Sequence, residues 1–440
     1  MSERSGKKRE PDSTDATTRG REMSEGGDST GAAAALAAAA GATAAAAGAT
    51  TAAGAGGTGW RLGAGLAGAA VGVVAAGAAV GVAVERLTVG RGMRRKARLA
   101  LDAAGPYGTL RGTPGTAVAE DGTVLHYEVD EADPEGAGGR RGRLFGRRPA
   151  PAVTVVFSHG YCLSQDSWHF QRAALRGVVR TVFWDQRSHG RSARAEGGDP
   201  VSIDLLGRDL KAVIDAAAPE GPLVLVGHSM GGMTTMALAA QYPELIAERV
   251  VGAAFVGTSS GKLSEVTYGL PAAGMNLVRR AVLPGAFKLM AAQTELVEKG
   301  RRATADLLAG IIKRYSFGSR DVDPAVARFA ERLIEATPVD VVAAFYPAFD
   351  EHDKVAALEA FGRLPVLVLA GEKDLITPSG HSEVIAAALP DAELVVVEGA
   401  GHLVMLEQPA TVSSHLTALL TATGAAGVRQ GRAAGAQPGG

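Results

Sequence analysis

The chain has little cysteine and almost no net charge. Cys162 is the one cysteine among 440 residues, which excludes an internal disulfide and any metal site built from several cysteines. The 45 basic and 46 acidic residues leave a net charge of −1, so no overall field favours nucleic acid or acidic partners. We therefore expect no nucleic-acid partner.

Large apolar side chains are almost absent from the first 59 residues. Residues 1–30 are polar and charged, and residues 31–59 are nearly all Ala, Gly and Thr. Neither segment has the bulky side chains from which a core is built, so residues 1–59 are predicted to be a disordered, low-complexity tail. A second disordered tail is predicted for residues 423–440.

Charge is absent from the segment that follows. The 23 residues from Leu62 to Val84 carry no charged side chain, and Trp60 lies just before them. A helix of this length reaches roughly 35 Å, whereas the hydrocarbon core of a bilayer is about 30 Å thick. Residues 60–85 are therefore predicted to form a single transmembrane helix with Trp60 at the interface. A buried Ala/Gly helix or continued low complexity is the alternative.

Basic residues after this segment set its expected orientation. Six lie between residues 86 and 98, whereas Arg61 is the only one in the twenty residues before the span. Because cytoplasmic flanks carry the excess of Lys and Arg, the C-terminal domain is expected on the cytoplasmic side of the membrane. Residues 86–115 are predicted to be a basic juxtamembrane linker.

From residue 116 onward, short apolar runs alternate with helical periods. The runs are apolar on both faces, which is typical of a mostly parallel sheet covered by helices on both sides. The predicted fold class is therefore α/β, with core parts at residues 116–258 and 362–422. Strands are predicted at residues 117–119, 123–129, 153–157, 181–184, 223–226, 250–256, 364–370 and 394–397, and helices at 167–175, 202–218, 234–241, 379–389 and 410–420.

The alternation stops between residues 259 and 361. This stretch has helical character, for example at residues 295–313 and 324–336, and it has no convincing strand. We predict a helical cap inserted into the sheet domain, over the strand ends where open α/β sheets bind ligands. Its aromatic residues either line an apolar pocket or form the cap's own core: Tyr268, Phe287, Tyr315, Phe317, Phe345 and Tyr346.

A glycine-flanked serine follows the predicted strand at 223–226. Residues 221–233 read G-P-L-V-L-V-G-H-S-M-G-G-M, so Ser229 lies at a sharp turn between a strand and a helix. We expect Ser229 in a strained backbone conformation that exposes its hydroxyl. Gly227 and Gly231 lack a Cβ and so relieve the crowding on either side of it.

A serine hydroxyl becomes a nucleophile when a neighbouring base removes its proton. His402 follows the predicted strand at 394–397, on a loop from which an imidazole reaches Ser229. A carboxylate must then orient this imidazole, and Asp374 and Glu372 both follow the strand at 364–370. The loop after the preceding strand, G-T-S-S-G-K-L-S, lacks an acid.

The developing oxyanion needs two backbone N–H donors. Met230 N–H follows the serine, and Tyr161 N–H is predicted as the second donor because it follows His159-Gly160 after the strand at 153–157. No base accompanies the adjacent Cys162, which is interpreted as a bystander. Of the other histidines near these motifs, three are expected to be structural and one is expected to be a surface residue. The structural ones are His159, His189 and His228, and the surface residue is His381.

These motifs together resemble the α/β-hydrolase superfamily over about residues 116–420. They are H-G-Y, W-D-Q-R-S-H-G-R-S with Ser188 where the family usually has glycine, G-H-S-M-G-G, and the pair G-E-K-D-L-I-T-P and G-A-G-H. The G-H-S-M-G-G form is similar to that of monoacylglycerol lipases, lysophospholipases and carboxylesterases. The resemblance implies the chain order Ser229, Asp374, His402, which favours Asp374 over Glu372.

The expected function is therefore a serine hydrolase that cleaves carboxylic esters with apolar or lipid-derived acyl groups. It needs no metal and no organic cofactor, and its partner is a small-molecule or lipid ester. A C–C bond hydrolase or a cofactor-free perhydrolase would use the same three residues. A membrane-anchored binding protein without turnover is the alternative from another class.

Overall fold

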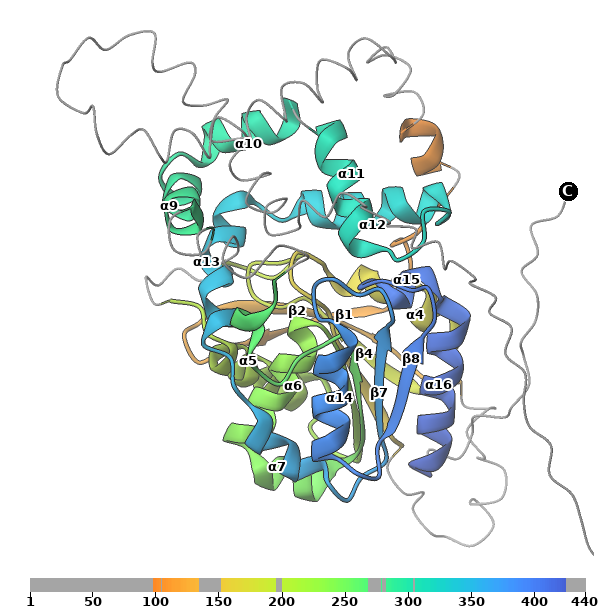
Figure 1. Ribbon diagram of the computed structural model, residues 1–440. Helices are drawn as coiled ribbons and strands as arrows, with labels where there is room; N and C mark the ends of the chain where they lie inside the picture. The colour runs from red at the N-terminus through yellow and green to blue at the C-terminus, as the bar shows by residue number, and fades with distance from the viewer. Residues whose placement is uncertain are drawn as a thin grey trace, which may run out of the picture.

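The fold is built on one sheet, which lies in the lower part of the molecule in Figure 1. Within the described residues this sheet has eight strands. This computed structural model describes residues 98–103, 105–133, 152–194, 200–267, 278, 282–303 and 305–424. The predicted transmembrane segment and the two predicted tails lie outside these residues, apart from residues 423 and 424. Within the described ranges, no helix has both the length and the apolar character needed to cross a bilayer.

The strands are arranged in the order β1-β2-β4-β3-β5-β6-β7-β8. β2 pairs antiparallel with β1 and β4, and every pairing from β4 to β8 is parallel. The prediction of a mostly parallel sheet is therefore confirmed. The strands are β1 Thr113–Val118, β2 Val124–Asp130, β3 Thr154–Ser158, β4 Arg180–Trp184, β5 Leu223–His228, β6 Val250–Val256, β7 Val366–Gly371 and β8 Glu393–Val397.

Helices cover both faces of the sheet because the central strands are apolar on both faces. Phe157 in β3 packs into the cluster formed with α4 and α16, whereas its neighbour Val156 packs into the cluster formed with α5, α6 and α14. The helices are α4 His169–Leu175, α5 Ile203–Ala217, α6 Met230–Gln241, α7 Pro243–Arg249, α14 Ser379–Ala388, α15 Val404–Glu407 and α16 Pro409–Ala422, with 3-10 turns η2 Gln165–Trp168, η3 Leu263–Glu265 and η5 Val355–Phe361.

Among the described residues between β6 and β7, five helices lie together on one side of the sheet domain, above it in Figure 1. We call them the cap. The helical stretch expected at residues 295–313 is divided between two of them, α10 and α11. The five are α9 Leu283–Ala292, α10 Thr294–Ala303, α11 Ala305–Ser316, α12 Pro324–Ala336 and α13 Val339–Asp350.

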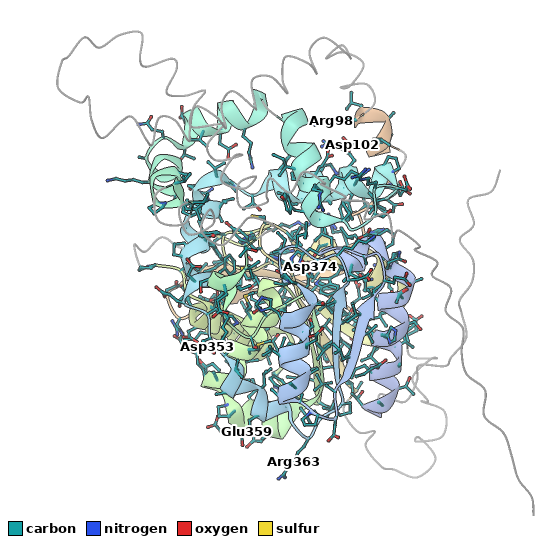
Figure 2. The ribbon with its side chains drawn as sticks, viewed as in Figure 1. Arg98, Asp102, Asp353, Glu359, Arg363 and Asp374 are labelled. Carbon is teal, nitrogen blue, oxygen red and sulfur yellow. The ribbon has the colours of Figure 1, made fainter. Side chains whose placement is uncertain are left out.

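The segment before β1 packs against the cap. Asp102, labelled in Figure 2, accepts hydrogen bonds from Arg328 and Arg332 of α12 at 3.2 and 2.6 Å. The Tyr107 ring contacts Phe329 of the same helix, with ring centroids 5.8 Å apart. Part of the stretch predicted as a linker is therefore held on the surface of α12.

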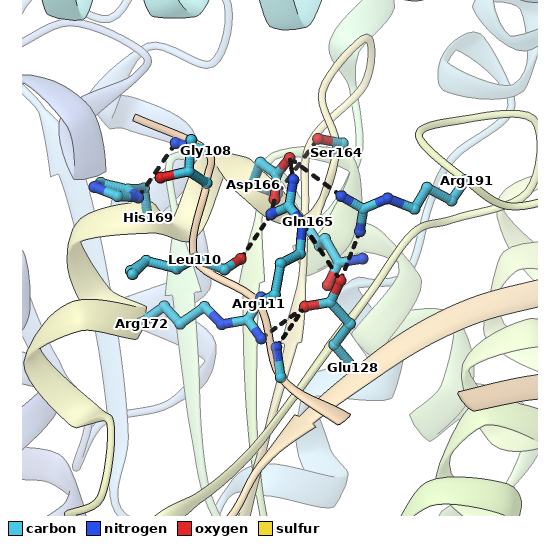
Figure 3. Close-up of polar contacts among 12 residues, drawn as sticks. Gly108, Leu110, Arg111, Glu128, Ser164, Gln165, Asp166, His169, Arg172 and Arg191 are labelled. Carbon is cyan, nitrogen blue, oxygen red and sulfur yellow. Dashed lines mark hydrogen bonds and ion pairs between the residues drawn. The ribbon is translucent and has the colours of Figure 1, made fainter. Parts of the chain in front are cut away.

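A buried ionic network joins this segment to the sheet (Figure 3). Glu128 of β2 accepts hydrogen bonds from Gly112 N–H at 2.9 Å and Arg191 at 2.7 Å, and it pairs with Arg172 of α4 at 2.8 Å. Burial opposes ionisation of Glu128, but these donors outweigh it and lower the pKa of the carboxyl. The network thus fastens the loop that carries Arg191 to strand β2.

Candidate active site

Ser229 lies at the sharp turn between β5 and α6. Its φ of 51° and ψ of −119° place a non-glycine residue in a sparsely populated conformation, as the sequence predicts. Backbone crowds both flanking glycines: a Cβ on Gly227 would lie 2.4 Å from the Gly231 carbonyl oxygen, and a Cβ on Gly231 would lie 2.2 Å from that of Ser158. Only glycine therefore fits at these two positions.

His402 and Asp374 form a hydrogen-bonded pair beside this turn. His402 lies on the loop after β8 and Asp374 on the loop after β7, and Nδ1–H of His402 donates to Asp374 Oδ2 at 2.8 Å. Asp374 Oδ1 accepts the N–H groups of Ile376 and Thr377 at 2.8 and 2.9 Å. Glu372 instead accepts Gly399 N–H at 2.9 Å on the exposed side of the loop.

The Ser229 turn and the His402–Asp374 pair lie against each other. His228 Nε2–H donates to the carbonyl oxygen of His402 at 3.0 Å, and the two imidazole rings are 4.8 Å apart between centroids. A Cβ on Gly257, at the end of β6, would lie 3.4 Å from that carbonyl and 3.5 Å from Asp374 Oδ2. The Ser229 hydroxyl itself makes no hydrogen bond to the described residues. Catalytic hydrogen bonds of this kind are often long in free enzymes and tighten when substrate binds.

The loop after β3, residues 159–164, forms the opposite wall of the site, and we call it the β3 loop. Leu163 N–H donates to the Gly160 carbonyl at 3.2 Å, which closes a tight turn with Cys162 at a φ of 59°. Gly160 is required for space rather than for a positive φ, because a Cβ there would lie 2.7 Å from His228 Nδ1 and 3.2 Å from Ser229 Cβ. Within the described chain, neither Tyr161 N–H nor Met230 N–H donates to a protein acceptor.

His159 and His189 hold the β3 loop by bonds to its backbone and to the neighbouring loop. His159 accepts Gln186 N–H at 2.9 Å, and His189 Nε2 accepts Cys162 N–H at 3.2 Å. Burial lowers the pKa of His159 to about 4 and that of His189 to about 3, so both rings are neutral near pH 7. Their expected structural role fits these contacts. Burial also raises the pKa of Cys162 to about 12, which keeps its thiol protonated.

The loop after β4 is held by charge and by an unusual backbone conformation. Ser188 has a φ of 64°, so it adopts the left-handed conformation that glycine adopts without a steric penalty. Arg187, which precedes it, donates two hydrogen bonds of 2.6 Å to the buried Asp209. This ion pair keeps the loop in place although Ser188 is strained.

An apolar wall from the cap lies over the turn. Phe345 of α13 is buried in one cluster with Met230 and Met233 of α6, next to Tyr161. Other aromatic residues of the cap lie in two different environments. Phe317 packs into the core on the α4–α16 face of the sheet, and Phe287 packs on Tyr346 with ring centroids 4.6 Å apart. Tyr268 lies outside the described residues.

Sequence reasoning missed two features of the site. Thr377 donates to Asp374 Oδ2 at 2.9 Å or to the Gly257 carbonyl at 2.8 Å, and its hydroxyl lies 3.3 Å from His402 Nδ1. A hydroxyl three residues after the candidate acid, in D-L-I-T-P, was the available signal. His381, expected to be a surface residue, is half-buried and hydrogen-bonded to Ser259 Oγ at 2.9 Å, because α14 begins beside the loop after β6.

Metal ligands do not gather in the described residues: no group of three or more His, Cys, Asp or Glu side chains there is placed to hold an ion.

Comparisons with known proteins cover most of the described core. A family model for the α/β hydrolase fold matches residues 153–409. The dihydrolipoyllysine-residue acetyltransferase component of the acetoin cleaving system of Pseudomonas putida is 29% identical over 285 residues, covering 64% of this chain and 67% of that protein. The sn-1-specific diacylglycerol lipase ABHD11 of Mus musculus is 28% identical over 288 residues, covering 62% and 82%. A solved esterase from Thermogutta terrifontis, with malate bound, shares the fold with a TM-score of 0.53 at 23% identity, over 70% of this chain and 98% of that one.

Proposed function

Because the chain belongs to the α/β-hydrolase family, we propose that it hydrolyses carboxylic esters, with Ser229 as the nucleophile. The observation that carries the proposal is the His402–Asp374 hydrogen bond of 2.8 Å beside a serine in a strained turn. Because His402 Nδ1–H donates to Asp374, Nε2 of the neutral ring is left to accept a proton.

In the proposed reaction Ser229 Oγ attacks the ester carbonyl carbon while its proton passes to His402 Nε2. The tetrahedral intermediate then expels the alcohol, which takes that proton, and leaves an acyl group on Ser229. Water attacks the acyl-enzyme through the same base and releases the carboxylic acid. Asp374 stabilises the imidazolium that forms in each half-reaction.

We propose that Tyr161 N–H and Met230 N–H bind the oxyanion. Both donors lack a protein acceptor within the described chain, and the missing Cβ of Gly160 lets the residue before Tyr161 lie close to Ser229. Preorganised donors of this kind lower the barrier because they are aimed at charge that develops only in the transition state.

The proposed substrate is an ester with an apolar acyl group. Phe345 and Met230 pack beside Ser229 in a buried apolar cluster, and the partly buried Tyr161 carries this apolar character to the site. The likeness to a diacylglycerol lipase supports a lipid-derived ester. The proposed membrane tether at residues 62–84, with the catalytic domain on the cytoplasmic side, would bring the site to such substrates.

The test is turnover of p-nitrophenyl esters of increasing acyl length by the full chain, with fluorophosphonate labelling of the same samples. Ser229→Ala should abolish both while its far-UV circular dichroism stays that of the parent, and the parent should favour longer acyl chains. Retained turnover in Ser229→Ala would contradict the proposal. Diketone cleavage or peracid formation that exceeds ester turnover would favour a C–C hydrolase or a perhydrolase instead.

A further inference from the structure

The side chain of Tyr161 binds the cap, although its backbone belongs to the β3 loop. Its hydroxyl donates to the Val342 carbonyl of α13 at 2.5 Å. Its ring meets Phe349 edge-on at 5.0 Å between centroids and stacks near Phe345 at 6.2 Å. Tyr161 is therefore bonded to the cap through its side chain, and the same residue carries the backbone N–H that we propose as an oxyanion donor.

The next peptide of the β3 loop is also supported by α13, through an intermediate ring. Cys162 N–H donates to His189 Nε2, and the edge of Phe345 packs on His189 with centroids 4.9 Å apart. His189 donates its Nδ1–H to the Arg187 carbonyl at 2.9 Å, which fixes Nε2 as the acceptor. Phe345 is 1% exposed, so it cannot move without disturbing these contacts.

Each side of this contact contains a local irregularity of the backbone. The β3 loop turns through Cys162 at a φ of 59°, a conformation that costs a non-glycine residue free energy. Pro347 lies inside α13 and supplies no N–H to the helical ladder, which weakens the helix close to Val342. The tyrosine hydroxyl bond and the aromatic contacts thus join two elements that each contain such an irregularity.

We infer that α13 sets the position of Tyr161 N–H, with Tyr161 and Phe345 acting as positioning residues between the cap and the oxyanion site. The inference rests on the proposed function. When α13 is seated, the N–H is aimed at the oxyanion; when its contacts are cut, the loop relaxes and the donor is displaced. Small displacements of this kind reduce transition-state binding far more than substrate binding.

The first test removes one oxygen atom. Tyr161→Phe should lower kcat for p-nitrophenyl ester hydrolysis about ten-fold, with KM within about two-fold, because an oxyanion donor is misplaced rather than lost. Affinity for a trifluoromethyl ketone, which mimics the tetrahedral adduct, should fall about ten-fold with it. Tyr242→Phe is the matched control: that hydroxyl has no hydrogen bond to the described chain, and kcat should not change.

The second test asks whether the two contacts act together. Phe345→Leu should lower kcat with KM little changed, and the double variant Tyr161→Phe, Phe345→Leu should be little slower than the slower single variant. The coupling would be overturned if the two single-variant losses in kcat multiplied in the double variant, or if KM rose at constant kcat. If circular dichroism shows that Tyr161→Phe does not fold, Phe345→Leu alone tests the inference. A lower kcat at nearly constant KM supports it, and a rise in KM at constant kcat contradicts it.

The parent and Ser229→Ala, measured in parallel, separate the two hypotheses. A parent that neither turns over esters nor reacts with the fluorophosphonate defeats the proposed function, and the inference fails with it. An active, labelled parent with an equally active Tyr161→Phe defeats the inference alone.

Discussion

Nδ1 of His402 lies 2.8 Å from Oδ2 of Asp374, and this contact selects one carboxylate from two candidates. Glu372 is only two residues away, but its side chain bonds to Gly399 N–H at 2.9 Å. The two loops after β7 and β8 therefore present Asp374, and not Glu372, to the imidazole.

Exchanging each carboxylate for its amide tests this selection. Asp374→Asn should lower kcat about 10⁴-fold, because an amide favours the wrong imidazole tautomer and does not stabilise the imidazolium. Glu372→Gln should leave kcat within about two-fold. Steady-state ester hydrolysis measures both, and a larger loss in the glutamine variant would reverse the assignment.

The Thr377 hydroxyl should position Asp374 and His402. Thr377→Val removes a donor that lies 2.9 Å from Asp374 Oδ2, and we expect kcat to fall about ten-fold at nearly constant KM. Thr377→Ser keeps the hydroxyl and should restore most of the rate. Equal rates in the valine and serine variants would show that the methyl group, and not the hydrogen bond, is what matters.

Gly231 should not tolerate a side chain. A Cβ there would lie 2.2 Å from the Ser158 carbonyl, so Gly231→Ala should lower the free energy of unfolding by at least about 2 kcal/mol. Gly380 in α14 is the control, since a Cβ there meets nothing within 4 Å. Gly380→Ala should leave the free energy of unfolding unchanged or raise it by up to about 0.5 kcal/mol, because Gly380 lies in the first turn of α14 and alanine loses less entropy there than glycine. Urea unfolding of both variants measures these changes. An unchanged free energy of unfolding in Gly231→Ala would contradict the predicted crowding.

Buried neutral histidines should make the fold acid-sensitive. Burial lowers the pKa of His352 from 6.5 to about 4, and its Nε2–H donates to the Ser259 carbonyl at 2.9 Å. Between these pH values the unfolded chain binds the proton and the folded chain does not, so stability falls as pH drops from about 6.5 to 4. His352→Gln keeps a donor but cannot titrate, and should flatten the slope of unfolding free energy against pH by about one proton. The parent chain measured in the same buffers is the reference, and an unchanged slope in His352→Gln would refute the prediction.

The local sequence predicted the structure correctly wherever one short segment determines the backbone conformation. The apolar run at 223–226 and the glycines at 227 and 231 predicted both β5 and the strained Ser229, because crowding at a sharp turn depends on adjacent residues. The alternation of apolar runs with helical periods predicted the α/β class for the same reason. The division of the stretch at 295–313 into α10 and α11 was not predicted from the sequence.

The sequence by itself determined the type of sheet, the serine turn and the set of residues that can act as base and acid, since periodicity and spacing depend on near neighbours. Only the tertiary structure decided which of these meet. It paired His402 with Asp374, added Thr377 to that pair and bonded Tyr161 to the Val342 carbonyl of α13. Tyr161 and Val342 are 181 residues apart in the chain. Such contacts depend on how helices and loops pack in space, and no local pattern encodes that packing.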